Sequence, residues 1–256
     1  MLAEIDSNIS ATALKALSVL DYIGEQRRPV SVMEVAEAIG ADRATAYRML
    51  MTLTQAGYVT RDGDKAYRMS FKVLSLSRHL VGENDRARQI IAVLRTISEA
   101  TGETVHYSAL ERDSAVLVFR AKGTQRVAVD FQIGDRSPLH CTSIGKVLLA
   151  YGDARAVERV ISDGLSATGP NTITDGEALR RALTRVRAQG YAYDDLEFAP
   201  DMRCVAFPVF ETGGEVPGGI AISGPSSRFT KSHLEWLRDM ATEHVTALSR
   251  TLGGVD

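Results

Sequence analysis

Apolar residues recur with helical spacing in three stretches of the first sixty positions. The first stretch predicts a helix from about residue 10 to 25, with an apolar stripe made of Ile9, Ala13, Leu17, Leu20 and Ile23. Ser31 and Glu34 have the spacing of a capping box, so a short second helix should run from there to Ile39, where Gly40 stops it. A third helix is predicted between Asp42, a residue type that caps helix N-termini, and Gly57.

The third predicted helix has one apolar face and one polar face. Packing would use the apolar positions Ala46, Met49, Leu50 and Leu53. The positions left facing outward are Ala44, Tyr47, Arg48, Met51 and Gln55. Residues 58–61 and 66–69 then flank an Asp62-Gly63 turn signal and predict a β-hairpin. Three helices followed by a hairpin is the element order of a winged helix-turn-helix.

The chemistry of the outward face agrees with DNA binding. In a helix-turn-helix, the second helix of the motif reads base edges in the major groove, where arginine can pair with guanine through two hydrogen bonds. The segment from Arg43 to Lys72 holds six basic residues and two acidic ones, and phosphate contact is a common use of such a local excess. The predicted DNA contacts are Arg43, Ala44, Thr45, Tyr47, Arg48, Arg61, Lys65 and Arg68. A protein-interaction module with the same element order is the alternative.

The pattern changes after the hairpin. Residues 71–84 predict a linker helix that ends at Gly82, and mixed helices and strands follow from Asp85 onward. Helices are expected near residues 85–101, 153–162, 175–189 and 230–250, and another is entered from the loop SPLHCTSIGK. Strands are expected at ETVHYSALE, at AVLVFRA, at Arg126–Phe131, and in an antiparallel hairpin made of RCVAFPVFE and VPGGIAISG.

Composition and charge narrow the class of protein. The 256 residues are 45% hydrophobic and carry a formal net charge of −2, so a nucleic-acid site has to be a local feature. No apolar run approaches the roughly 20 residues that span a bilayer. Cys141 and Cys204 lie far apart without metal-ligand spacing, and no signal peptide opens the chain, so we expect a cytoplasmic protein.

The sequence contains no local motif that indicates catalysis. A cysteine, Cys141 or Cys204, paired with His140 or His106 is the strongest candidate for a nucleophile and its base. No nucleophile elbow, phosphate loop or paired metal-ligand spacing accompanies these residues. We therefore expect no catalytic residues, no cofactor and no metal ion.

The stretch HCTSIGK suggests anion binding rather than catalysis. Small and hydroxylic residues lead into a predicted helix, whose first N–H groups are free to bind a carboxylate or phosphate. A simpler reading is that Thr142 or Ser143 caps the helix, and both readings can hold together.

Four stretches in this order together resemble the IclR family of bacterial transcriptional regulators over essentially the whole chain: TAYRMLMTLTQAGYVTRDGDKAYRMS, PLHCTSIGKVLLA, GYAYDDLEFAPDMRCVAFPVF and GGIAISGP. The resemblance implies an α+β protein with an N-terminal winged helix-turn-helix domain at residues 1–70 and a linker helix at 71–84. Residues 85–256 would form a GAF-like effector-binding and oligomerisation domain, an antiparallel sheet flanked by helices. A homodimer or homotetramer that binds an operator in double-stranded DNA is implied, and we favour repression over activation.

The resemblance also implies an effector site. It places a carboxylate at the amides of Ser143 and Ile144, with Asp194, Cys204 and Ser223 around the ligand. Met202 and Val129 would form an apolar wall. Ala221 stands where the family has another serine, so a donor is missing and a modest aromatic or branched acid is favoured over a two-carbon acid. The alternative is a C-terminal domain that only oligomerises and binds no ligand.

Overall fold

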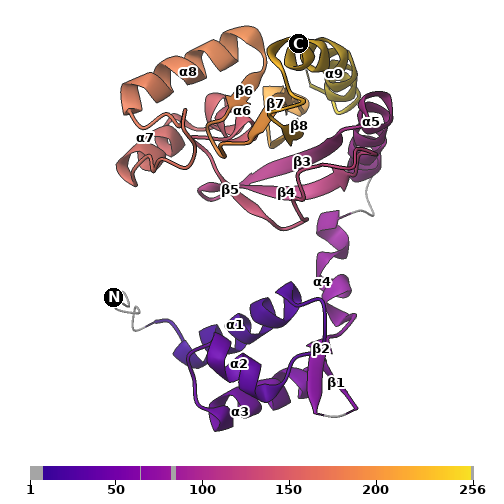
Figure 1. Cartoon of the computed structure of the whole chain (residues 1–256), viewed down its shortest axis with the longest axis vertical. Helices are drawn as coiled ribbons and strands as arrows, with labels where there is room; N and C mark the ends of the chain where they lie inside the picture. The colour runs from indigo at the N-terminus through magenta and orange to yellow at the C-terminus, as the bar shows by residue number, and fades with distance from the viewer. Residues whose placement is uncertain (1–7, 64, 82–84, 255–256) are drawn as a thin grey trace. The chain divides into compact units, whose positions relative to one another are not determined.

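The computed structural model describes residues 8–63, 65–81 and 85–254, and the chain divides after Leu80 into two compact units (Figure 1). The N-terminal unit consists of α1 (Ala11–Glu25), α2 (Val32–Ala38), α3 (Arg43–Gln55), β1 (Val59–Asp62) and β2 (Ala66–Met69). The helix α4 (Lys72–Val81) follows the hairpin, and the predicted helix end at Gly82 lies outside the described residues. The expected winged helix-turn-helix order is present.

Short-range hydrogen bonds define the starts of α2 and α3. The hydroxyl of Ser31 accepts from the amide of Glu34, and the Glu34 carboxylate accepts from the amide of Ser31, which completes the predicted capping box. Asp42 caps α3 by accepting from the amide of Thr45 at 2.9 Å. After α3, Gly57 adopts φ +80°, a conformation that favours glycine.

One apolar core joins the three helices to the hairpin. Its buried residues are Val19, Ile23, Val30, Val35, Ala36, Ala46, Leu50, Leu53, Val59 and Tyr67. The predicted inner face of α3 is confirmed, with Met49 partly buried against this core. The predicted stripe of α1 is wrong at its N-terminal end, because Ile9, Ala13 and Leu17 are exposed. The C-terminal end of the stripe is confirmed, because Ile23 is buried and Leu20 is partly buried against the core. Val19 is buried as well, since packing partners decide which arc of a helix is buried.

Lys72, one of the basic residues near the predicted DNA contacts, has a structural partner. Its ammonium donates to the carbonyl of Ala56, the C-cap of α3, at 2.6 Å and lies 4.5 Å from the centre of the Tyr58 ring. A cation at a helix C-terminus is favoured by the helix dipole. The Lys72 side chain is therefore occupied within the N-terminal unit.

The C-terminal unit contains a six-stranded antiparallel sheet with the strand order β5-β4-β3-β8-β7-β6. Its strands are β3 (Thr104–Glu111), β4 (Ser114–Ala121), β5 (Arg136–Pro138), β6 (Ala192–Asp195), β7 (Met202–Val209) and β8 (Gly218–Pro225). Its helices are α5 (Asp85–Thr101), α6 (Ser143–Tyr151), α7 (Ala154–Ser162), α8 (Gly176–Gln189) and α9 (Lys231–Thr251), with a short 3-10 turn, η1 (Thr212–Gly214).

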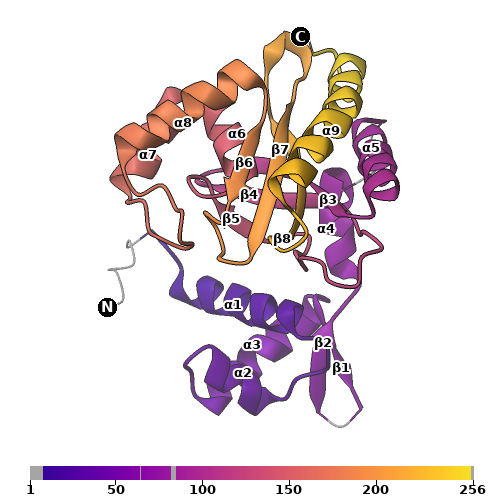
Figure 2. The same ribbon diagram turned by 45° about the horizontal axis from the view of Figure 1, so that its top comes forward.

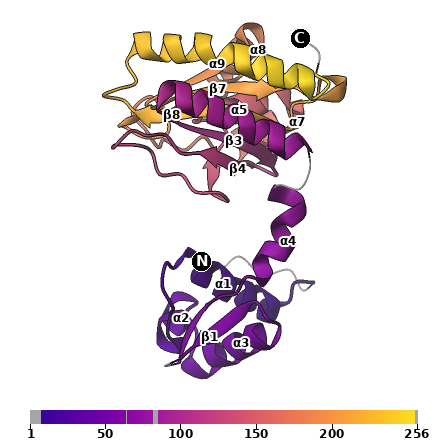
Figure 3. The same cartoon turned by 90° about the vertical axis from the view of Figure 1, so that its right-hand side faces the viewer.

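Both faces of this sheet are covered by helices. Figure 2 shows α6, α7 and α8 gathered on one side of the sheet, and Figure 3 shows α5 and α9 side by side on the other. Large side chains such as Val205, Phe207 and Ile220 point to α5 and α9. The alternate positions carry small residues, among them Ala206 and Ala221, which pack under α6. The alternation of side chains along each strand thus separates two cores.

The strand predicted at Arg126–Phe131 is wrong. Those residues form no regular strand in the described chain, and the short strand that pairs with β4 is β5, at Arg136–Pro138. Arginine side chains bind backbone carbonyls of the segment instead: Arg228 donates to Val127 at 3.0 Å, and Arg120 donates to Phe131. An alternating sequence becomes a strand only where a neighbouring strand is available to pair with it.

Candidate functional site

The face of α3 that the sequence marked for DNA is open to solvent. Arg43, Ala44, Tyr47 and Arg48 are exposed, and Tyr47 keeps 46% of its surface accessible. The guanidinium of Arg48 donates to the Thr45 hydroxyl at 3.3 Å. Because the apolar arc of α3 is used by the core, this face is left for contacts outside the unit.

Part of the hairpin lies beside that face. A shallow hollow is lined by five of the predicted DNA contacts, which are Arg43, Ala44, Tyr47, Arg61 and Lys65, together with Val32 and Tyr67. Its wall therefore carries three cationic side chains and two phenols. Thr45, Arg48 and Arg68 do not line the hollow: Arg68 lies 4.0 Å from Asp62, and the Thr45 hydroxyl donates to the Asp42 carboxylate at 2.8 Å.

A second candidate site is a cavity of about 240 Å³ on the α6 side of the sheet in the C-terminal unit. Strand register builds its floor, because Asp194 pairs with Cys204 and Cys204 pairs with Ser223 across three neighbouring strands. Met202 lies two residues from Cys204 and shares its face. Four predicted effector contacts are thus brought together by the pairing of β6, β7 and β8.

The N-terminus of α6 forms another wall of the cavity. Thr142 is the N-cap: its hydroxyl accepts from the amide of Gly145 at 3.0 Å and donates to the carbonyl of Pro138 at 2.7 Å. A helix cannot satisfy its first amides internally, and those of Ser143 and Ile144 belong to this class. A Cβ on Gly145 would lie 2.4 Å from the carbonyl oxygen of Leu139, so glycine allows this close packing of the helix start.

Asp194 is fully buried, and among the described residues only one of its two carboxylate oxygens has hydrogen-bond partners. One carboxylate oxygen, Oδ1, accepts from the amides of Glu197 and Phe198 at 2.8 and 3.3 Å. The other, Oδ2, has no hydrogen-bond partner among the described residues, and the same holds for Oγ of Ser223. The pKa of Asp194 is raised to about 7: burial is the main cause and the nearby Glu197 carboxylate contributes, while the two amides and Lys146 oppose the shift.

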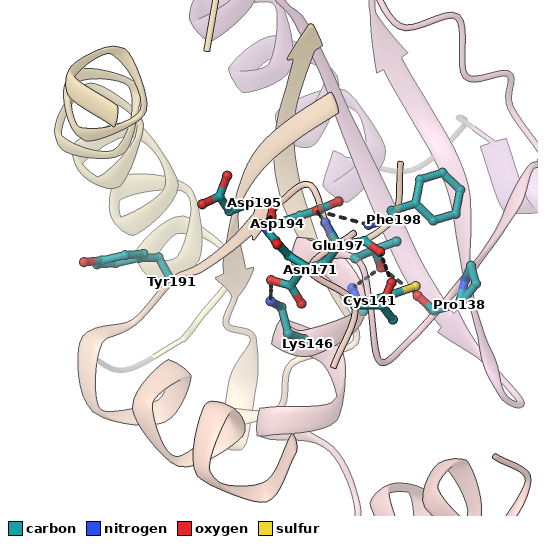
Figure 4. Close-up of polar contacts among 12 residues, drawn as sticks. Pro138, Cys141, Lys146, Asn171, Tyr191, Asp194, Asp195, Glu197 and Phe198 are labelled. Atoms are coloured by element: carbon teal, nitrogen blue, oxygen red, sulfur yellow. Dashed lines mark hydrogen bonds and ion pairs between the residues drawn. The ribbon is translucent and has the colours of Figure 1, made fainter. Parts of the chain in front are cut away.

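A buried ion pair supports the loop that follows Asp194. The ammonium of Lys146, on α6, donates to the carboxylate of Glu197, and both side chains are nearly inaccessible (Figure 4). Figure 4 also shows Cys141 and Phe198 near this cluster. Because Glu197 contributes both the charge that meets Lys146 and the amide that meets Asp194, the pair fixes the position of the carboxylate in the cavity.

The cysteines are not prepared for nucleophilic chemistry. Burial holds the pKa of the Cys204 thiol well above its ordinary value and raises that of Cys141, so both stay protonated near neutral pH. His140 is bound through Nε2 to the carbonyl oxygen of Ser166 at 3.0 Å rather than to a thiol.

Within the described ranges, no group of three or more His, Cys, Asp or Glu side chains could hold a metal ion.

The cavity contains six of the seven effector contacts expected from the sequence: Ser143, Ile144, Asp194, Met202, Cys204 and Ser223. Val129 does not line it, whereas Phe131, two residues later in the same irregular segment, does. Ala221 does not line the cavity either, since it is packed under α6. Its replacement of a serine therefore does not widen the cavity.

Sequence reasoning missed several lining residues, including His106, Ser108, Leu117 and Phe198. A signal existed for two of them, because His106 and Ser108 are polar and alternate with the apolar Val105 and Tyr107 in one predicted strand. Leu117 reaches the cavity through a register shift between β3 and β4 that could not be foreseen.

No helix within the described residues has the length and apolar character needed to cross a membrane.

Comparison with known proteins gives matches along nearly the whole chain. The IclR helix-turn-helix domain matches residues 12–63, and the bacterial transcriptional regulator IclR C-terminal region matches residues 79–250. The HTH-type transcriptional regulator KdgR of Escherichia coli K12 is 34% identical over 228 residues, which cover 88% of this chain and 86% of that protein.

Solved structures agree in fold. The crystal structure of the Thermotoga maritima IclR has a TM-score of 0.80 and 30% identity, covering 94% of this chain and 98% of that one. An IclR homolog from Microbacterium hydrocarbonoxydans, complexed with 4-hydroxybenzoate, has a TM-score of 0.78 and 21% identity, covering 94% of this chain and 100% of that one. These matches confirm the expected α+β fold and a non-enzymatic role: the chain belongs to the IclR family of DNA-binding bacterial transcriptional regulators.

Proposed function

We propose that residues 1–70 bind an operator in double-stranded DNA and residues 85–256 bind an effector, with residues 71–84 as the linker. The observation that carries the first part is the cationic hollow between α3 and the hairpin, lined by Arg43, Arg61 and Lys65. The start of α3 reads base edges in the major groove through Arg43, Ala44, Thr45, Tyr47 and Arg48. Arg61, Lys65 and Arg68 on the wing bind phosphates.

The proposed effector is a small aromatic acid. Its carboxylate lies at the amides of Ser143 and Ile144, where the helix dipole of α6 favours an anion. A hydroxyl turns toward Asp194 and Ser223, whose buried oxygens lack partners among the described residues. Leu117, Phe131 and Met202 enclose the ring. The 4-hydroxybenzoate complex of the Microbacterium homolog supports a ligand of this class.

The proposed active form is a homodimer, or a homotetramer built from two dimers. Exposed large apolar side chains occur on α1, on α4 and at the residue before α4: Leu17, Phe71, Leu74 and Leu76 each keep more than half of their surface accessible. Exposed apolar surface is available for contacts between subunits. Two heads joined in one dimer also gain affinity for a two-fold symmetric operator through effective concentration.

Regulation follows from linkage between the two sites. The effector shifts the dimer between states with different spacing of the DNA-binding heads, by no more than its differential affinity for those states. We propose repression, in which the dimer occupies the operator and excludes other proteins until the effector weakens its hold on DNA.

A base contact by Arg48 is tested by Arg48→Ala on an operator recovered by genomic DNA pull-down. Loss of a two-hydrogen-bond contact to guanine should cost about 1–3 kcal/mol on the operator and little on random DNA, measured by fluorescence anisotropy. Arg181→Ala, at an exposed position of α8, is the control and should leave both affinities unchanged. Equal losses on both DNAs would assign Arg48 to a phosphate.

The oligomeric state is tested by light scattering at micromolar concentration. The chain of 27.8 kDa should give the mass of a dimer or tetramer, and Leu17→Asp should lower the mass and weaken operator binding. Ile133→Asp changes an equally exposed apolar residue of the C-terminal unit and should do neither. A monomer that still binds the operator tightly would refute the proposal.

The effector site is tested by calorimetric titration of 4-hydroxybenzoate and short aliphatic acids. The aromatic acid should bind more tightly, and Asp194→Ala or Ser223→Ala should weaken it at least about tenfold, or roughly 1.4 kcal/mol. Ser162→Ala, on the exposed side of α7, is the matched control. If thermal shifts with a wide panel of acids detect no ligand, the C-terminal unit serves oligomerisation alone.

The pH dependence of binding follows from Asp194. Its raised pKa, about 7, keeps the side chain neutral at low pH, so affinity for an anionic acid should fall as the pH rises through 7. Asp194→Asn should remove this fall.

The stability of the protein without ligand should also depend on pH through Asp194. The neutral carboxyl favours the folded state below the unfolded pKa of about 4, and this contribution is lost as the pH rises to 7. In urea unfolding, the Asn variant should therefore gain stability relative to wild type at pH 8 but not at pH 4. Parallel profiles would contradict the assignment.

A further inference from the structure

His106 is a polar side chain of the cavity that the proposed effector contacts leave unused. It lies on β3, keeps only 4% of its surface accessible and lines the same cavity as Asp194 and Ser223. Its Nδ1 atom is buried without a hydrogen-bond partner in the described part of the chain. Because Nδ1 is enclosed by protein atoms, Nε2 is the ring nitrogen through which a molecule in the cavity can reach the imidazole.

The sheet places His106 next to the other polar groups of the cavity. Ser223 pairs with Thr104, and His106 lies two residues further along β3, so His106 and Ser223 are diagonal neighbours on one face. The residue directly opposite His106 is Ala221, which has no side-chain donor or acceptor. The Phe131 ring stands edge-on to the imidazole at a centroid distance of 5.7 Å. His106 therefore supplies a polar group on this side of the cavity, as does Ser108 on the same strand.

We propose that His106 is a further specificity-determining residue of this cavity, whose imidazole hydrogen-bonds a second hydroxyl of an aromatic acid that carries two neighbouring hydroxyls. The inference rests on the proposed effector site and extends it. The first hydroxyl meets Asp194 and Ser223, and the second, on the adjacent ring carbon, meets His106. Since Nδ1 is the enclosed ring nitrogen, the geometry assigns the ligand contact to Nε2.

The electrostatics of His106 fit a neutral ligand group. The pKa of the imidazole is lowered to about 4, chiefly by burial and also by the positive charge of Arg120, so the ring is uncharged at neutral pH. A neutral imidazole does not compete with the N-terminus of α6 for the ligand carboxylate. It can donate one hydrogen bond and accept another, and a phenolic hydroxyl can complement either role.

The test compares 3,4-dihydroxybenzoate with 4-hydroxybenzoate, which differ by one hydroxyl, in calorimetric titrations of the full-length chain. Wild type should bind the dihydroxy acid about tenfold more tightly, the size expected for one buried hydrogen bond. His106→Phe keeps a ring beside Phe131 but has no donor, so the preference should disappear. His106→Gln places an amide group near the position of Nε2 and should retain part of it.

The outcomes separate this inference from the proposed effector site. Equal affinity of wild type for the two acids, or a preference that persists in His106→Phe, would overturn the role of His106 while leaving the site intact. Failure of wild type to bind either acid would overturn both. Thermal melting and operator binding of both variants report whether they fold, and the Gln variant keeps the test decisive if the Phe variant does not.

Discussion

The C-terminal unit depends on a sheet that is buried on both faces, so each strand has to serve two environments at once. Because successive side chains point to opposite faces, Val205 and Phe207 can pack on α5 and α9 while Cys204 and Ala206 face α6. The two sides differ in residue size. Large apolar residues fill one core, whereas small and polar residues on the other face leave room for α6 and for the cavity beside its N-terminus. The cavity is thus a consequence of the packing that stabilises the sheet.

Buried charge imposes a second constraint on that face. Lys146 and Glu197 form an ion pair with little access to water, and removing one partner of such a pair typically costs about 3–5 kcal/mol. The pair also holds the turn after β6, where Leu196 adopts φ +61°. Asn171 (Figure 4) donates from its side chain to the carbonyl of Asp195 at 2.9 Å. Thr168 donates to the carbonyl of Glu197 at 3.0 Å. Asp194 is held rigidly as a result, which favours a cavity formed before a ligand arrives.

In the N-terminal unit, only one arc of α3 is needed for packing. Its core uses one arc of α3, and the caps at Asp42 and Lys72 satisfy the two ends of the helix from within the unit. The remaining arc, with Arg43, Tyr47 and Arg48, has no role in the core. Side chains on that arc can therefore change without loss of packing in this core.

What the sequence determined by itself was local. The capping box at Ser31 and Glu34, the cap at Asp42 and the start of α6 depend on hydrogen bonds within four residues, so their residue types are sufficient to predict them. Family resemblance added Asp194, Cys204 and Ser223, which are far apart in the chain. Tertiary structure alone decided that Arg126–Phe131 forms no strand, that Val129 misses the cavity and that α1 buries Val19 and not Leu17. It also placed His106 opposite Ala221. These outcomes depend on strand register and on which surfaces meet, and neither property is encoded in the spacing of neighbouring residues.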